Sequence, residues 1–212
     1  MVDLQRMILA GSAGLALMAG GCGMNNIKFD RYNVEAPLVV VSDGLFSTEA
    51  RRFFRELCDE ESVPYLGEDN VSWFKNKKAI EEAWKQKRDI ILIGYSAGCH
   101  QAKLTAEWCN EKNIPVSAIF FDPTYLAGNS GKSIPGNVSD ISVYLSERNI
   151  PDILAIGKGR EIAQSDLRNP QTKYYNNALK GAHLDIFRDN SERLKGEMKK
   201  EIRAHRKITY PR

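Results

Sequence analysis

The chain has 212 residues, of which 42% are hydrophobic and 27% charged, and this composition is typical of an ordinary globular domain. Its 30 Lys and Arg against 27 Asp and Glu leave a net charge of +3, which is too weak to indicate nucleic acid as a partner. Four cysteines are too few for a disulfide scaffold, and a chain of this length needs neither disulfides nor a structural metal to fold.

The first 21 residues are typical of a secretory signal. Arg6 precedes an apolar run from Met7 to Ala19, which is too short to span a bilayer but has the length of a signal's hydrophobic region. The sequence Met-Ala-Gly-Gly before Cys22 resembles the lipobox of bacterial lipoproteins. That resemblance implies a lipidated Cys22, an anchor and linker over residues 22–36, and an exported protein held in the cell envelope. A cleaved soluble signal and a disordered or packed N-terminus are the alternatives.

The other three cysteines are Cys58, Cys99 and Cys109. Cys99 and Cys109 are ten residues apart in one expected helix, or about 15 Å along its axis, which is too far for a disulfide. We expect all three to be buried for structural reasons.

Apolar runs alternate with helical patterns from residue 37 onward. In the expected helix that begins near Thr48, for example, Ala50, Phe53, Phe54 and Leu57 recur at helical spacing. In chain order, we expect a strand at 37–41, a helix at 48–61, a strand at 63–66, a helix at 72–87, a strand at 89–94, a helix at 97–112, and strands at 115–121, 141–145 and 172–176.

Near-continuous apolar strands separated by helices indicate βαβ units. The pattern therefore predicts an α/β domain over residues 37–190, with a mostly parallel sheet covered by helices on both faces. The long loop at residues 125–137 is expected at the carboxyl ends of the strands, beside the ligand crevice.

The tail from Arg188 to Arg212 contains nine Lys or Arg and four Asp or Glu. Leu194, Met198 and Ile202 form a narrow apolar stripe through it, so residues 191–212 are expected to form a basic C-terminal helix and tail packed by that stripe. The alternative is a basic face lying on anionic lipid headgroups.

The strongest motif is G-x-S-x-G at residues 94–98, with Ser96 at its centre. It follows an expected strand and precedes an expected helix, which is where a serine sits on a strained turn with its hydroxyl exposed above the sheet. Glycines on both sides let neighbouring backbone approach closely, and the N–H of Ala97 can face an oxyanion. This context predicts that Ser96 is a nucleophile.

A serine hydroxyl needs a base, and the chain offers three histidines. His100 is one helical turn beyond Ser96 and is expected to be a packed helix residue, while His205 lies in the charged tail. His183 follows the last expected strand in a loop that contains glycine, where it can reach over the serine. By elimination, His183 is the predicted base.

The acid is predicted less narrowly. Asp122 directly ends the strand after the nucleophile strand, so its carboxylate is expected at the same edge of the sheet as Ser96. An Asx turn leading into Pro123 is the structural alternative for Asp122. Glu147 and Asp152, after the next expected strand, are the other candidates.

Over residues 37–190, the motifs resemble those of the α/β-hydrolase family, in the order nucleophile, acid, histidine. Residues 94–100, together with residues 121–123, look like the pancreatic-type lipase variant, in which the acid follows the strand after the nucleophile. The resemblance implies a three-layer sandwich around a mostly parallel sheet, and it favours Asp122 over Glu147.

The same resemblance implies a second oxyanion donor from the loop after the first strand. Here this loop contains Asp43, Gly44 and Leu45, and the N–H of Leu45 would act beside that of Ala97. Gly44 fits a close approach, but Asp43 departs from the family pattern because a carboxylate opposes an oxyanion unless it is turned away.

These residues predict a serine hydrolase that cleaves an ester or thioester of modest size, with Ser96, His183 and Asp122 in the catalytic roles. No metal or organic cofactor is expected, and the expected partners are a small-molecule or lipid ester and the membrane that holds Cys22. A non-catalytic envelope lipoprotein that keeps the fold for binding is the alternative from another class. Acyl transfer by the same residues is a third possibility.

Overall fold

The apolar runs of the sequence form a six-stranded sheet in the computed structural model, which describes residues 27–44, 49–68, 76–123, 134–146, 161–181 and 185–206. The strand order is β2-β1-β3-β4-β5-β6, and each neighbouring pair is parallel. The strands are β1 (Leu38–Ser42), β2 (Tyr65–Glu68), β3 (Ile90–Tyr95), β4 (Val116–Phe121), β5 (Val138–Ser146) and β6 (Lys173–Leu179).

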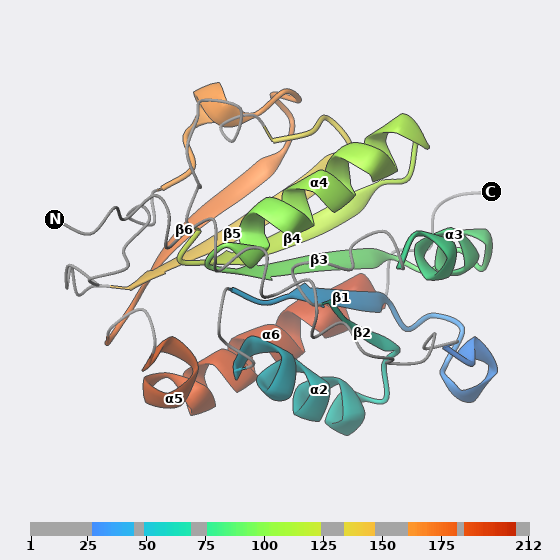
Figure 1. Ribbon diagram of the computed structural model, residues 1–212, viewed down its shortest axis with the longest axis horizontal. Helices are drawn as coiled ribbons and strands as arrows, with labels where there is room; N and C mark the ends of the chain where they lie inside the picture. Colours follow the sequence, from blue (N-terminus) through green and yellow to red (C-terminus); the bar gives the residue numbers. More distant parts are fainter. Residues whose placement is uncertain are drawn as a thin grey trace, which may run out of the picture.

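Helices cover both faces of this sheet (Figure 1). One face carries α3 (Lys77–Lys85) and α4 (Gly98–Glu111), and the other carries α2 (Glu49–Glu61), α5 (Ile186–Asp189) and α6 (Ser191–His205). Short 3-10 turns at Phe29–Arg31 and Gln164–Asp166 complete the described elements. The predicted α/β class, with a parallel sheet between two helical layers, is confirmed.

The best-predicted strands are those buried on both faces. Every residue of β1, β3 and β4 is buried, so these strands read as continuous apolar runs. The last strand was predicted to end at Asn176 but runs on to Leu179, and its first four residues are exposed. Because β6 is an edge strand with a polar face, the apolar pattern could not mark its end.

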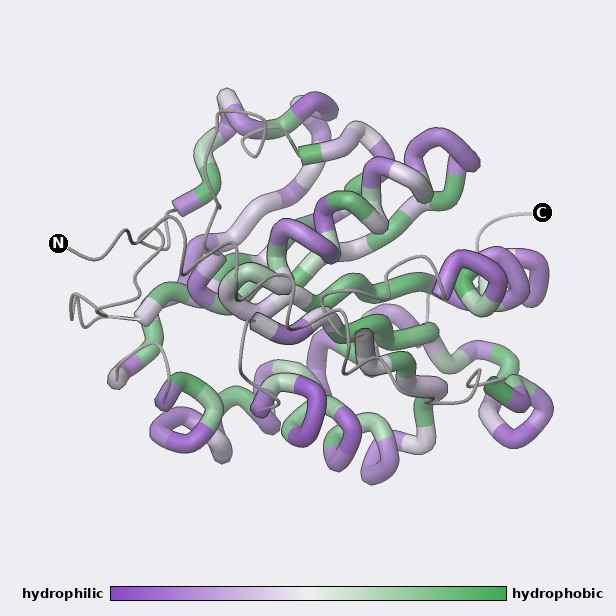
Figure 2. Tube along the Cα trace, in the orientation of Figure 1, coloured by the Kyte–Doolittle hydropathy of each residue, from purple (hydrophilic) through white to green (hydrophobic). Residues whose placement is uncertain are grey.

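The core lies in two layers, one on each side of the sheet. Figure 2 shows the hydrophobic strands between helices whose outer faces are hydrophilic. On the α6 side, Leu194, Met198 and Ile202 are all buried against the sheet, so the predicted apolar stripe is confirmed. Cys58, Cys99 and Cys109 are buried free thiols, as expected.

Much of the basic charge of α6 is paired with α2. Lys195 and Lys199 lie 3.5 and 2.8 Å from the carboxylate of Glu60, and the guanidinium of Arg203 lies 2.7 Å from that of Glu61. These pairs turn part of the basic face toward a neighbouring helix. Among the described residues, no helix is both long enough and apolar enough to cross a membrane.

The amino end of α4 lies directly against the carboxyl end of β1, and Gly98 permits this contact because it has no side chain. A Cβ atom at Gly98 would overlap the carbonyl oxygen of Ser42 and lie 2.6 Å from that of Asp43. At Gly94, a Cβ atom would lie 2.5 Å from the Cα of Cys99. Both glycines of the motif are therefore required by close backbone approach, as the sequence predicted.

Two helical glycines give a matched test of this packing. Gly98→Ala should lower the free energy of unfolding by about 2–3 kcal/mol, because backbone atoms cannot move aside. Gly196→Ala, on α6 where a Cβ atom meets nothing within 4 Å, should raise it by about 0.5–1 kcal/mol. Urea unfolding followed by circular dichroism measures both, and similar effects at the two positions would contradict the close approach.

Candidate active site

Ser96 lies on the tight turn that joins β3 to α4. Its φ angle is +54°, in the left-handed region that a residue other than glycine occupies at a cost of about 1–3 kcal/mol. Its N–H donates a hydrogen bond of 2.9 Å to the carbonyl of Phe121, at the end of the neighbouring strand β4. This geometry matches the strained turn that the motif predicted.

The loop after β1 lies directly against the Ser96 side chain. A Cβ atom on Gly44 would lie 2.8 Å from the Cβ and 3.3 Å from the Oγ of Ser96. The backbone of this loop at Gly44 therefore lies directly against the side chain of Ser96. Ala97 is at the amino end of α4, where the first N–H groups have no partner within the helix.

The carboxylate of Asp43, a residue of this loop, points toward α2. It is buried, accepts a 3.1 Å hydrogen bond from the backbone N–H of Arg51, and lies 2.6 Å from Nε of the same residue. The Arg51 guanidinium offsets its charge, so Asp43 fastens the loop to α2. Arg51 could not be identified as this partner from the sequence, because no local pattern marks a partner eight residues away.

Asp122 directly follows β4 and also has a positive φ, of +41°. Tyr95, the last residue of β3, pairs with Phe121, the last residue of β4. Ser96 and Asp122 directly follow these two residues, so both lie at the carboxyl ends of adjacent strands. Asp122 is buried, and its Oδ1 accepts a 2.7 Å hydrogen bond from the N–H of Ser146 at the end of β5. This hydrogen bond joins the end of β4 to the neighbouring strand β5. An Asx turn into Pro123 would instead be a contact within the local segment.

The segments on both sides of His183 are held near this edge of the sheet. Phe187 packs against Tyr95, the residue before Ser96, with ring centroids 5.3 Å apart. Asn190 is buried, and its side-chain amide donates hydrogen bonds of 2.7 and 2.9 Å to the carbonyls of Lys180 and Ile186. These contacts fasten both ends of the loop that carries the predicted base.

Several predicted residues lie outside the described part of the chain. These are His183, Leu45, the alternative acids Glu147 and Asp152, and Cys22. The described residues include Ser96, Asp122 and Ala97, which lie at one end of the sheet, and the catalytic roles of all the predicted site residues remain predictions.

The remaining reactive groups are placed differently. Cys99 directly follows the G-x-S-x-G motif, at the start of α4, and its thiol is buried. Burial raises the pKa of the thiol well above its usual range, so the thiol stays protonated. His100 lies on the first turn of α4, where burial, followed by the charge of Lys103, lowers the pKa of its imidazole. His205, in the charged C-terminal segment, is buried at the amino ends of the strands, opposite Ser96.

A cavity of about 240 Å³ lies between α2, α5 and the start of α6. Phe53 and Phe187 give it an apolar wall, and its lining carries charges of both signs, from Arg52, Arg188, Lys195, Glu49 and Glu56. Neither Ser96, Gly44 nor Asp122 lines it, so this cavity is separate from the candidate nucleophile.

The arrangement of strands and helices is shared with solved structures of enzymes. The chain aligns with human thioesterase 2 at a TM-score of 0.53 and 12% identity, over 83% of this chain and 100% of that one. It aligns with an esterase from the hyperthermophilic archaeon Pyrobaculum calidifontis at 0.56 and 14%, over 80% and 77% of the two chains. For a monoacylglycerol lipase of Paleococcus ferrophilus, the values are 0.51 and 12%, over 80% and 96%.

No protein-family model and no curated protein sequence matches the chain. At 10–14% identity, the structural likeness concerns the fold and not the reaction. The six-stranded parallel sheet with helices on both faces is that of an α/β-hydrolase fold.

Proposed function

We propose that the protein is a serine hydrolase that cleaves a carboxylic ester or thioester. The observation that carries this proposal is the left-handed Ser96 between β3 and α4, with Gly44 against its side chain and Asp122 on the adjacent strand. The names of the similar structures, a thioesterase, an esterase and a monoacylglycerol lipase, support the same substrate classes.

In the proposed reaction, Ser96 Oγ attacks the acyl carbonyl while His183 takes the hydroxyl proton. The N–H groups of Ala97 and Leu45 bind the oxyanion of the tetrahedral intermediate. The intermediate collapses to an acyl-serine as His183 protonates the departing alcohol or thiol. Water, deprotonated by His183, then releases the carboxylic acid and restores Ser96, while Asp122 orients His183 and stabilises its positive form.

The location of this activity is a second part of the proposal. A lipid on Cys22 would hold the hydrolase at a membrane of the cell envelope, where a lipid ester or a small-molecule ester could reach it. The ion pairs of Lys195, Lys199 and Arg203 with α2 leave less of the basic helix for anionic headgroups. We therefore assign the anchoring to Cys22.

A fluorophosphonate probe tests the nucleophile directly. The full chain should be labelled on Ser96, and Ser96→Ala and heat-denatured protein should not be labelled. Ser62→Gly is the matched control, because Ser62 also has a positive φ, of 51°, but is exposed after α2. Folded protein that stays unlabelled would count against the hydrolase and favour a binding role for the same fold.

Asp122 can be distinguished from its rivals by conservative substitution. Asp122→Asn should slow hydrolysis of a short-chain p-nitrophenyl ester by about 10³–10⁴-fold, because the imidazolium of His183 would lose its counter-charge. Glu147→Gln and Asp152→Asn should leave kcat within about twofold. A large loss at either of these two positions, with Asp122→Asn nearly unaffected, would reassign the acid.

The close approach of Gly44 also has a measurable consequence. Gly44→Ala should lower kcat/KM by about 10²–10³-fold, because the added methyl group pushes the oxyanion loop away from Ser96. Gly136→Ala is the control, since its Cβ atom would meet only Asn110 Oδ1, at 3.9 Å. Equal activity of the two variants in the ester assay would show that the loop does not serve Ser96.

A further inference from the structure

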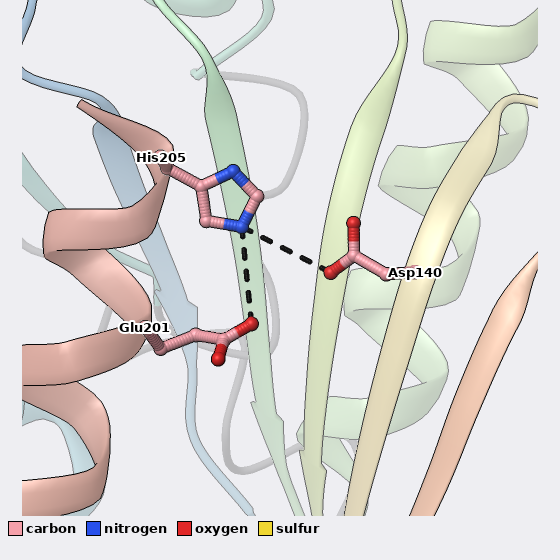
Figure 3. A group of neighbouring side chains, drawn as sticks. All are labelled: Asp140, Glu201 and His205. Carbon is pink, nitrogen blue, oxygen red and sulfur yellow. Dashed lines mark ion pairs between the residues drawn. The ribbon is translucent and has the colours of Figure 1, made fainter. Parts of the chain in front are cut away.

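A second group of titratable side chains lies at the amino ends of the strands, away from Ser96. His205, in the last turn of α6, faces Asp140 on β5 and Glu201 one helical turn earlier (Figure 3). The side chain of His205 is only 7% exposed, while those of Asp140 and Glu201 are 23% and 35% exposed. One side of this group is therefore open to ions from solution.

The spacing of the three side chains suits a shared ion better than direct hydrogen bonds. His205 Nε2 is 3.9 Å from Asp140 Oδ1 and 3.8 Å from Glu201 Oε1, and the three atoms lie within 4.8 Å of one another. Both distances exceed the usual hydrogen-bond range of about 2.7–3.2 Å. Two ligand atoms that are each about 2.0–2.2 Å from one zinc ion lie roughly 3–4 Å apart.

The surrounding residues orient these three atoms. Asp89 Oδ2 lies 3.5 Å from His205 Nδ1, and this buried oxygen accepts no hydrogen bond from a described residue. This oxygen can accept a hydrogen bond from His205 only if Nδ1 carries a proton. In that tautomer the lone pair of Nε2 is directed toward Asp140 and Glu201.

The Asp140 carboxylate is oriented in the same way. The hydroxyls of Ser117 and Ser139 donate hydrogen bonds of 2.8 and 2.6 Å to its Oδ2, which leaves Oδ1 facing His205. Carboxylates beside a histidine and hydroxyls beside a carboxylate are the outer contacts usual around protein metal ligands. An adjacent cavity of about 20 Å³, lined by Asp89, Ser117, Ser139 and His205, is large enough for one water molecule.

We propose that His205 Nε2, Asp140 Oδ1 and Glu201 Oε1 bind one divalent cation of the zinc type. One imidazole and two carboxylates suit zinc, whereas magnesium and calcium prefer ligands that are all oxygen. Water completes the coordination on the open side. The ion fastens the end of α6 to β5, and because this edge is opposite Ser96, the role is structural and independent of the proposed hydrolysis.

The alternative occupant is a proton. Burial by itself lowers the pKa of His205, but the carboxylates of Asp89, Glu201 and Asp140 raise it to about 9. A protonated His205 would bridge the carboxylates without metal. Zinc titration of the full chain therefore decides between the two occupants.

The experiment uses the full chain freed of metal with a chelator and then titrated with ZnSO₄ at pH 8. One equivalent should bind, and a hundredfold excess of free zinc over Kd should raise Tm by roughly 5–10 °C. His205→Gln and Glu201→Gln should each abolish most of this shift. Glu201 is the more exposed residue, so Glu201→Gln tests the site even where His205→Gln fails to fold.

His100→Gln is the matched control, because it removes the other described histidine and should retain the full shift. The absence of zinc binding to folded wild-type protein would overturn the proposal, as would an equal shift in all three variants. Fluorophosphonate labelling of the same samples keeps this result separate from the proposed reaction, since Ser96 should be labelled with or without zinc.

Discussion

The candidate active site depends on the contact between the first turn of α4 and the end of β1. Gly98 lies so close to the carbonyl groups of Ser42 and Asp43 that any side chain there would overlap them. With the helix this close to the sheet, the chain has only the short turn at Ser96 in which to reverse, and Ser96 takes a positive φ. A residue held in that conformation persists only because the surrounding packing determines it.

The parallel pairing of the strands places two other segments at the same end of the sheet as the serine. The Gly44 loop follows β1, Ser96 follows β3, and Asp122 follows β4, and these strands are neighbours in the order β1-β3-β4. Two buried carboxylates near this edge have different surroundings. Asp43 is paired with the guanidinium of Arg51, and Asp122 accepts a hydrogen bond from the backbone N–H of Ser146.

The sequence predicts those parts of the molecule that local patterns encode. Strands β1, β3 and β4 are buried on both faces, and G-x-S-x-G contains its own strand, turn and helix, so both could be recognised from neighbouring residues. Arg51 beside Asp43 and the burial of His205 could not be recognised. Their partners come together only when the sheet forms, and residues such as Asp89 and Asp140 are remote from His205 along the chain.

Helix α6 runs from the carboxyl ends of the strands to their amino ends. Its start is joined to the loop that carries His183, through Asn190 and the carbonyl of Lys180, and its end is joined to the amino edge through His205. Between these points, Leu194, Met198 and Ile202 are buried against the sheet, so the helix cannot slide without exposing them. The contacts at the two ends of α6 and the buried side chains between them therefore fix the position of the helix along the sheet, and its last turn contributes through the contacts of His205 with Asp89 and Asp140.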